Sequence, residues 1–303
     1  MPSVTLTWRD RSVLEDGQRI YRSTSPLDLE ALPTPIADIA ANLTTYTDST
    51  VAANTTYYYA VESYNSLDAK VSYQIMIKTD QDPNFNNVSL LLHFNGTDGS
   101  TRFVDNSPRP KTMTSSSATN CAIRTDQYEF LPSSLGKTGA TWINNSTAHV
   151  DFNLGNTYTV ECSIFVNAIG DTQGIFIVGN PASNMHRIQG AINPDGTLLF
   201  FIQAGTGQTA FIQTTAAITA ATWHKAAFEQ NGTAYYIFLD GVLAASGTVT
   251  LTITWSNRIY IGTARSGGAA LPFNGNIDEF RVTKGVALYT SSYTPSDSPF
   301  PNS

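Results

Sequence analysis

The sequence carries little charge, and what it has is mostly acidic. Only 14% of its 303 residues are charged, and 17 Lys and Arg stand against 24 Asp and Glu, for a net charge of −7. Such a chain has no electrostatic basis for binding nucleic acid or an anionic membrane surface. It also lacks a run of about 20 apolar residues that would span a bilayer, and a basic segment followed by an apolar one at its start. We therefore expect a soluble chain with no secretion signal, no nucleic-acid partner and no membrane insertion.

Cysteine and histidine are scarce as well. The two cysteines, Cys121 and Cys162, are too few for a disulfide framework. Cys162 lies in the alternating run TYTVECSIFV, so we expect it to face a core as a reduced thiol. The four histidines show no H-E-x-x-H or H-x-H spacing for a transition metal, and no G-x-S-x-G, G-x-x-x-x-G-K-[ST] or G-x-G-x-x-G motif is present. Nucleophilic and nucleotide chemistry are therefore unsupported.

The hydrophobic pattern alternates with a period of two along nearly the whole chain. The recurring residues are Val, Ile, Tyr, Phe and Thr, which favour strands. Asn231-Gly232 and Asp240-Gly241 separate such runs and tolerate the positive φ angles of tight hairpins. The sequence therefore predicts an all-β protein built of short strands in sandwiches.

A polar segment interrupts this pattern once. DQDPNFNN, at 80–87, is rich in Asp, Pro and Asn and has no apolar periodicity. We place the domain boundary here and predict a first domain over 1–79, a linker over 80–86 and a second domain over 87–303. Each domain has its own set of alternating strands, so we expect the two to fold independently.

The first domain resembles a fibronectin type III domain. The runs VTLTW (4–8), QRIYRST (18–24) and YYYAVESY (57–64) read as sandwich strands. The resemblance implies that Trp8 is a core residue and that Tyr57 is the tyrosine-corner residue, whose hydroxyl ties back to the preceding loop. Almost nothing precedes VTLTW, so the usual first strand is missing or very short. This leaves an edge that a neighbouring chain in an assembly would cover.

The second domain resembles the laminin-G-like, concanavalin A-like jelly rolls of bacteriophage tail proteins. Four ordered segments carry the resemblance, and the last resembles phage copies far more than eukaryotic modules. Asn95, in the opening segment, stands where an aspartate is usual. The segments are SLLLHFNGTDGSTRFVDNSP (89–108), TYTVECSIFV, TWHKAAFEQNGTAYYIFLDGV (222–242) and GNIDEFRVTKGVALYTSSYTPSDSPFP (275–301).

Jelly-roll glucanases carry E-x-D-x-x-E on one strand, which aligns their carboxylates on one face. This chain has no such run. Outside the first domain its adjacent acidic pair is Asp278-Glu279, and consecutive strand residues point to opposite faces. We therefore predict no catalytic residues and a structural or ion-binding role for Asp278.

Binding residues are the remaining candidates. Sandwich loops hold sugars with aromatic faces and with amide or carboxylate hydrogen bonds. The candidates are Trp142, Asn144, Asn145, Trp255 and Asn257, from GATWINNSTAHVDF and LTITWSN. The alternative for each tryptophan is a half-buried position under a loop. Trp223, like Trp8, lies inside an alternating strand, and we assign both to cores.

The resemblance also implies a structural calcium site, because laminin-G-like jelly rolls often bind calcium where the opening loop meets the closing strand. The residues carried over are Asp105 and Asn106 in FVDNSP and Asp278 in NIDEF. Calcium needs six to eight hard oxygen ligands, and these residue types supply them. The alternative is that Asx-turn hydrogen bonds hold the loop without an ion.

These observations lead to one main hypothesis and two alternatives. The main one is a non-enzymatic bacteriophage virion protein, synthesised in the host bacterial cytoplasm. It would be a tail-associated structural or receptor-binding component, present as an oligomer beside other virion proteins and contacting host-surface glycans. The alternatives are a capsid decoration protein and a polysaccharide-degrading tail enzyme whose acids come from different strands.

Overall fold

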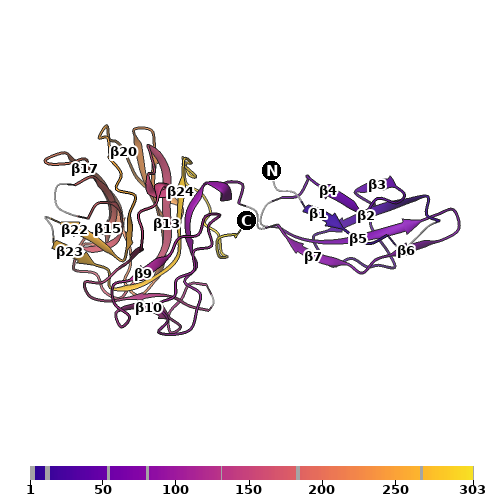
Figure 1. Cartoon of the computed structure of the whole chain (residues 1–303), viewed down its shortest axis with the longest axis horizontal. Helices are drawn as coiled ribbons and strands as arrows, with labels where there is room; N and C mark the ends of the chain where they lie inside the picture. The colour runs from indigo at the N-terminus through magenta and orange to yellow at the C-terminus, as the bar shows by residue number, and fades with distance from the viewer. Residues whose placement is uncertain are drawn as a thin grey trace. The chain divides into compact units, whose positions relative to one another are not determined.

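The chain folds into two compact units, the first made mainly of residues up to Pro83 and the second spanning Asn84–Phe300. Strands dominate both, which confirms the all-β prediction, and in the described part of the chain no helix is long and apolar enough to cross a membrane. Of the predicted linker, residues 80 and 81 lie outside the described residues. Figure 1 shows the computed structural model, which describes residues 4–10, 14–52, 55–79, 82–130, 132–181, 185–266 and 269–302.

The first unit has two antiparallel sheets. One pairs β1 with β4, and the other has the order β3-β2-β5-β6, with β7 also paired to β5. The three predicted strands correspond to β1, β2 and β5. The strands are β1 (Val4–Thr7), β2 (Gly17–Ser23), β3 (Ala37–Ala40), β4 (Thr45–Asp48), β5 (Thr56–Tyr64), β6 (Ala69–Val71) and β7 (Ile75–Lys78).

Residues from both sheets form the first core. Val4 and Leu6 of β1 pack with Ile20 of β2 and with Tyr57 and Tyr59 of β5. The hydroxyl of Tyr57 accepts a hydrogen bond from the backbone N–H of Ala52, at 3.0 Å. The predicted tie between Tyr57 and its preceding loop is therefore present.

The second unit is a sandwich of an eight-stranded and a seven-stranded antiparallel sheet. The eight-stranded sheet has the order β10-β11-β24-β13-β18-β19-β20, with β8 paired to β24. Its strands are β8 (Val88–Leu92), β10 (Cys121–Arg124), β11 (Ser134–Lys137), β13 (Thr157–Val166), β18 (Trp223–Asn231), β19 (Ala234–Leu239), β20 (Val242–Thr248) and β24 (Gly275–Lys284). A short 3-10 helix, η1 (Phe85–Asn87), precedes β8.

The seven-stranded sheet has the order β17-β16-β15-β14-β21-β12-β9. A separate hairpin, β22 (Thr263–Ser266) and β23 (Ala269–Pro272), packs on β14 and β15 (Figure 1). A second 3-10 helix, η2 (Val150–Phe152), follows β12. The sheet's strands are β9 (Met113–Ser115), β12 (Ile143–Asn145), β14 (Gln173–Gly179), β15 (Arg187–Ile192), β16 (Thr197–Gln203), β17 (Thr209–Ala217) and β21 (Ile259–Ile261).

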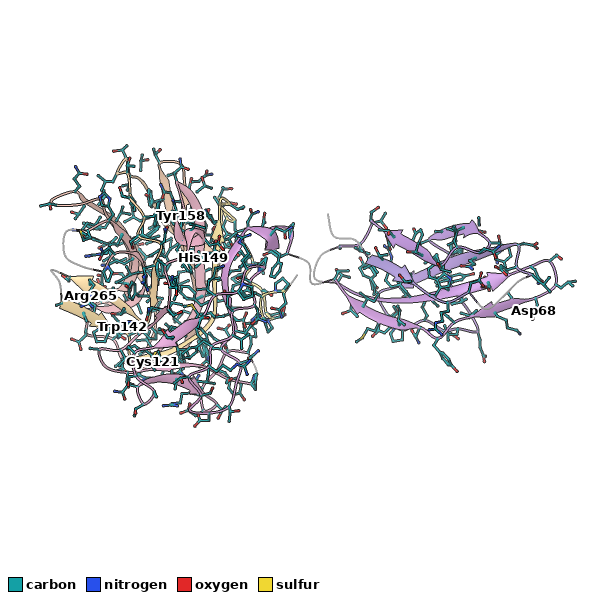
Figure 2. The ribbon with its side chains drawn as sticks, viewed as in Figure 1. Asp68, Cys121, Trp142, His149, Tyr158 and Arg265 are labelled. Carbon is teal, nitrogen blue, oxygen red and sulfur yellow. The ribbon has the colours of Figure 1, made fainter. Side chains whose placement is uncertain are left out.

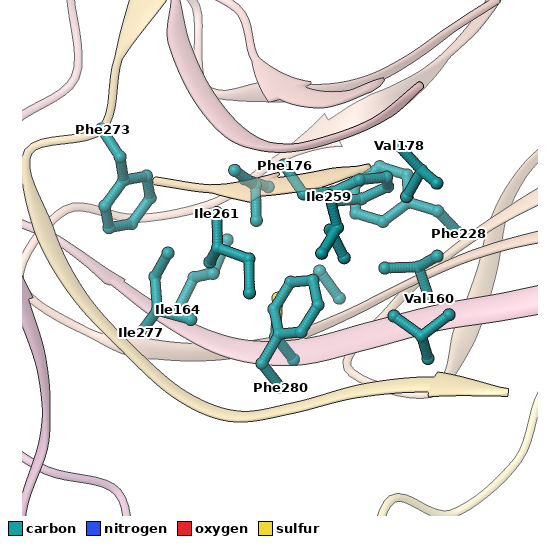
Figure 3. Packing of buried hydrophobic residues seen from close by; sticks show 14 of the residues in the cluster. Val160, Ile164, Phe176, Val178, Phe228, Ile259, Ile261, Phe273, Ile277 and Phe280 are labelled. Atoms are coloured by element: carbon teal, nitrogen blue, oxygen red, sulfur yellow. The ribbon is translucent and has the colours of Figure 1, made fainter. Parts of the chain in front are cut away.

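Alternating side chains from the two sheets form one continuous core (Figure 3). Phe176 of the seven-stranded sheet makes edge-to-face contacts with Phe228 and Phe280 of the other sheet, with ring centroids 5.3 and 6.2 Å apart. Cys162 is buried in this core, as predicted, and both cysteines are free thiols. The alternation read from the sequence therefore specifies which face of most strands is buried.

Both predicted hairpin turns are present in the eight-stranded sheet. Gly232-Thr233, directly after Asn231 at the end of β18, joins β18 to β19, and Asp240-Gly241 joins β19 to β20. Gly232, Asp240 and Gly241 have φ angles of 64°, 50° and 79°, the left-handed region that such turns need.

Candidate functional site

One face of the seven-stranded sheet points away from the core. Strand side chains alternate, so Ile143, Ile261 and Phe200 face the core while their neighbours face outward. The register aligns six outward residues in a row from β12 to β17, in the order Asn144, Tyr260, Ile177, Gln189, Phe201 and Phe211. Ile177 and Gln189, in the middle of the row, are 0% and 3% exposed, so the row reaches solvent only at its two ends. We call this row, together with Trp142, Arg187 and Arg265, the open face.

The β22–β23 hairpin places Arg265 on the open face. Its guanidinium carbon lies 5.7 Å from the ring centroid of Trp142 (Figure 2). The Gln189 side chain fixes the hairpin by donating to the Arg265 carbonyl at 3.0 Å and accepting from the Arg265 N–H at 3.1 Å. The hairpin approaches β14 closely because residue 174 is glycine: a Cβ there would lie 1.8 Å from the Ala264 nitrogen.

Arg187 adds a second cation to this face. It is only 3% exposed, and its guanidinium carbon lies 5.8 Å from the ring centroid of Phe201. Burial, and secondly the positive charge of Arg265, lower the pKa of Arg187 below the usual arginine value. Arg187 and Gln189 project from the same side of β15, so Arg187 lies near the residue that holds Arg265.

The open face offers aromatic surface together with hydrogen-bonding groups. Phe211 is 60% exposed, and Trp142, Asn144, Phe201 and Tyr260 are partly exposed. Aromatic rings provide flat apolar contact, and amide and guanidinium groups orient a polar ligand by hydrogen bonds. Of the predicted binding residues, Trp142 and Asn144 lie on this face.

Asn145 was predicted as a binding residue, but it is a structural residue. Its side chain is 0% exposed. The amide oxygen accepts from the Ile259 N–H at 2.9 Å, and the amide nitrogen donates to the carbonyls of Thr147 and Asn257 at 2.6 and 3.1 Å. Buried polar groups of this kind are satisfied within the fold, so Asn145 fixes the approach to β21 and is not available to a ligand.

Trp255 and Asn257 lie apart from the open face. Trp255 packs edge-to-face on Tyr158, with centroids 6.0 Å apart, and lines a separate groove of about 680 Å³ with Asn153, Asn156 and the 249–254 segment. Asn257 has a φ of 59°, which marks it as a turn residue, and its carbonyl accepts from Asn145. The structure therefore divides the five predicted binding residues among the open face, this groove and a buried turn.

The carboxylates of the residues predicted to bind calcium accept hydrogen bonds within the fold. The Asp105 carboxylate accepts backbone N–H bonds from Leu91, Ser107 and Lys111 at 3.1, 2.9 and 2.7 Å. The neighbouring Asn106 donates its own N–H to the Leu91 carbonyl at 2.8 Å. These three N–H donors take up most of the carboxylate's roughly four lone-pair sites, so Asp105 holds its loop by an Asx turn to Ser107 and by bonds to Leu91 and Lys111.

Asp278 is held in the same way at a different place. Its carboxylate accepts from the N–H groups of Glu129, Phe130 and Glu279 at 3.1, 3.1 and 2.9 Å. Burial raises the pKa of Asp278 to about 7. Among the described residues, no group of three or more His, Cys, Asp or Glu side chains is placed to hold a metal ion.

The prediction that Asp278 and Glu279 point to opposite faces is wrong. The strand register shifts opposite Cys162, and Glu279 has a φ of 48°, so β24 contains a bulge. Ile277 and Phe280 both face the core. The two acidic residues lie between them and both have their carboxylates on the outer side of the eight-stranded sheet.

That outer side carries further acidic residues under the C-terminal segment. Glu161 and Glu229 project from neighbouring strands and are buried. Residues 285–300, which we call the strap, cover them. Tyr289 donates its N–H to Glu229 at 2.9 Å and its hydroxyl to Glu161 at 2.8 Å, and Phe300 donates its N–H to Glu279 at 2.7 Å. We call this covered surface the carboxylate face.

Trp223 also lies on the carboxylate face, so its assignment to the core is wrong. Ala226 and Phe228 of β18 face the core, and the alternation places Trp223 with Glu229 on the other side. There Trp223 packs on Phe165, with ring centroids 5.6 Å apart. Trp8, in contrast, packs against the first core, as predicted.

The fold of the second unit belongs to a known structural class. A laminin G family model, described as the concanavalin A-like lectin/glucanases superfamily, matches residues 137–288, about half of the chain. The chain therefore belongs to this superfamily, which confirms the jelly-roll prediction for the second domain. No curated protein matches the chain.

Solved structures share this fold at low sequence identity. One is a structure of botulinum neurotoxin type C, a toxin whose cell entry depends on interaction with two ganglioside molecules. It is 12% identical to this chain, with a TM-score of 0.50 over 67% of this chain and 49% of that one. Domain 4 of AbnA, an extracellular arabinanase from Geobacillus stearothermophilus, in complex with arabinotriose, is 18% identical, with a TM-score of 0.49 over 66% and 93%. This chain spans about half the length of the neurotoxin structures it matches. At 12% identity and a TM-score of 0.50, the likeness to the neurotoxin structure shows the fold alone.

Proposed function

We propose that the second unit is a non-enzymatic carbohydrate-binding domain that holds its ligand on the open face. The observation that carries the proposal is that strand register places four exposed or partly exposed side chains, those of Asn144, Tyr260, Phe201 and Phe211, on one face that also bears the Trp142–Arg265 pair. Aromatic rings stack on the apolar faces of sugar rings, and Asn144 supplies directional hydrogen bonds. Membership of the concanavalin A-like superfamily supports the same ligand class.

The carboxylates support binding rather than hydrolysis. A glycosidase needs two carboxyl groups that reach one glycosidic bond. Glu161, Glu229, Asp278 and Glu279 are buried and hydrogen-bonded, three of them to the strap. A sugar chain would have to displace residues 285–300 to reach them.

The biological setting that we propose is a bacteriophage virion, most specifically its tail. The resemblance of the closing segment, 275–301, to phage tail proteins supports this setting. The first unit, with its short β1–β4 sheet, would attach to other virion proteins in an oligomeric assembly, and the second would meet host-surface carbohydrate. Fractionation of virions into tails and heads, followed by mass spectrometry, tests this placement against capsid decoration.

A glycan array probed with the full chain tests carbohydrate binding. We expect binding to a defined subset of glycans and a loss of about fivefold to tenfold in affinity for Tyr260→Ala, because one stacking ring contributes about 1–1.4 kcal/mol. Tyr128→Ala, an exposed tyrosine in a loop outside the open face, is the matched control and should bind normally.

Two outcomes would contradict the proposal. The first is no binding to any glycan on the array by a folded protein. The second is the release of new reducing ends from a bound polysaccharide, which would favour the polysaccharide-degrading alternative.

A further inference from the structure

Charge is distributed unequally between the two sheets of the second unit. The strands of the seven-stranded sheet and of the β22–β23 hairpin contain no Asp or Glu, and their charged residues are Arg187 and Arg265. The chain as a whole has a net charge of −7. The open face is therefore a positive surface on an acidic protein.

We infer that the open face binds an acidic sugar, one that carries a carboxylate or a sulfate, and that Arg265 contacts the anionic group. This inference rests on the proposed carbohydrate function and specifies its ligand class. Guanidinium groups donate parallel N–H bonds to planar or tetrahedral oxyanions, and such charge-assisted bonds are among the strongest in proteins. An acidic ligand suits this face better than a neutral one.

Arg265 is built to present its side chain at a fixed place. Its backbone donates to and accepts from the Gln189 side chain, and its guanidinium carbon lies 5.7 Å from the Trp142 ring centroid. The two backbone bonds hold the hairpin in place, so less conformational entropy is lost when a ligand binds. Trp142 beside it offers a ring on which the sugar of the same ligand stacks.

Arg187 adds to the positive electrostatic potential near Arg265. It is almost fully buried against Phe201, where its charge is poorly screened by solvent. Arg187 lies two residues from Gln189, which holds Arg265, so its positive charge adds to the attraction for an anion bound at Arg265 without touching it.

The eight-stranded sheet provides the internal contrast. Its carboxylates accept hydrogen bonds from the protein's own donors, chiefly Arg281 and the strap. Arg281 donates from Nε and Nη2 to Glu161 at 2.8 and 2.7 Å, and Tyr289 of the strap donates to Glu229. The carboxylates of the eight-stranded sheet are thus paired within the fold, whereas the strands of the open face carry arginine and no carboxylate.

Paired probes that differ only in charge test the inference on the full chain. The pairs are sialyllactose and its carboxyl methyl ester, polygalacturonic acid and its methyl ester, and dextran sulfate and dextran. The first two pairs report on a carboxylate and the third on a sulfate. We expect the acidic member of at least one pair to bind at least about tenfold more tightly at low salt, and this preference to shrink as salt is raised.

Variants separate this inference from the function on which it rests. Arg265→Gln keeps both backbone bonds to Gln189 and should abolish the preference for the acidic probe, and Arg265→Lys should restore part of it. Arg102→Gln removes the same charge from an exposed loop and should bind like the wild type.

If the neutral member binds as tightly as the acidic one, or if Arg265→Gln keeps the preference, the acidic-ligand inference is overturned and the carbohydrate function stands. If no probe of either kind binds and the glycan array is also blank, both are overturned.

Discussion

The two sheets of the second unit share one core, but their outer faces differ in charge and in cover. The carboxylate face buries Glu161, Glu229, Asp278 and Glu279 beneath the protein's own backbone and strap. The open face bears arginine and leaves aromatic side chains exposed. Polar groups that satisfy each other inside a fold stabilise it, whereas exposed aromatic rings beside a cation are typical of a ligand surface.

This contrast teaches that acidic residues in a jelly roll are not by themselves a sign of catalysis. Asp278 and Glu229 both have pKa values raised to about 7 by burial, a feature common at active sites. Here the same shift accompanies hydrogen bonds to backbone N–H groups. The following predictions separate the structural role of one face from the binding role of the other.

The largest expected effect is on the carboxylate face. Asp278→Ala leaves the N–H groups of Glu129, Phe130 and Glu279 buried without their acceptor. We expect a loss of the order of 3 kcal/mol in the free energy of unfolding, measured by denaturant titration. Asp171→Ala, at an exposed position, is the control. An Asp278→Ala protein as stable as the wild type would show that these bonds do not support the fold.

The next effect concerns the open face. Gly174→Ala forces a Cβ against the Ala264 backbone, so we expect a loss of about 2–3 kcal/mol and displacement of the hairpin that carries Arg265. Gly96→Ala is the control, because its Cβ would make an ordinary 3.5 Å contact with Ile123. Glycan affinity should fall in Gly174→Ala and not in Gly96→Ala. Equal affinity in the two variants would show that the hairpin does not contribute to glycan binding.

A smaller effect is expected from pH. Burial is the main cause that raises the pKa of Glu229 to about 7, above the value of about 4.3 in an unfolded chain. The folded state therefore holds this proton more tightly, and stability falls as pH rises from about 4.5 to about 7. Glu229→Gln should flatten that fall and raise stability at pH 8 by about 1–2 kcal/mol. Unchanged pH dependence of the melting temperature in Glu229→Gln would contradict the assignment.

The smallest effect is expected from calcium. Backbone N–H groups occupy the oxygens of Asp105 and Asp278, so melting temperatures of the full chain should coincide in excess calcium and in chelator. A midpoint that rises with calcium concentration, as RT ln(1 + [L]/Kd) requires for binding to the folded state, would overturn this conclusion.

Alternation in the sequence was sufficient to predict the sandwich class, the hairpin turns and the core position of Cys162. The alternation failed where one extra residue in a strand reverses which of the following side chains face the core. The β24 bulge at Glu279 places two consecutive acidic residues on the same side, and no local sequence signal marks it. Trp223 was misplaced because an alternating run shows two faces without saying which one is buried.

The open face was found only in part from the sequence. Trp142 and Asn144 were named because they lie in a loop-like segment, whereas Tyr260, Phe201 and Arg265 come together through the register of distant strands. One signal was available: the segments 172–194, 196–228 and 241–277 contain no acidic residue in a chain of net charge −7. That pattern predicts a surface of distinct charge, although it does not predict which side chains meet there.

Hydrogen–deuterium exchange of the full chain, with and without a glycan identified on the array, tests the central claim most directly. The account predicts that bound glycan slows exchange in β12, β21 and the β22–β23 hairpin, and leaves the strap at 285–300 unchanged. Protection of the strap and the carboxylate face, with the open face unaffected, would contradict it.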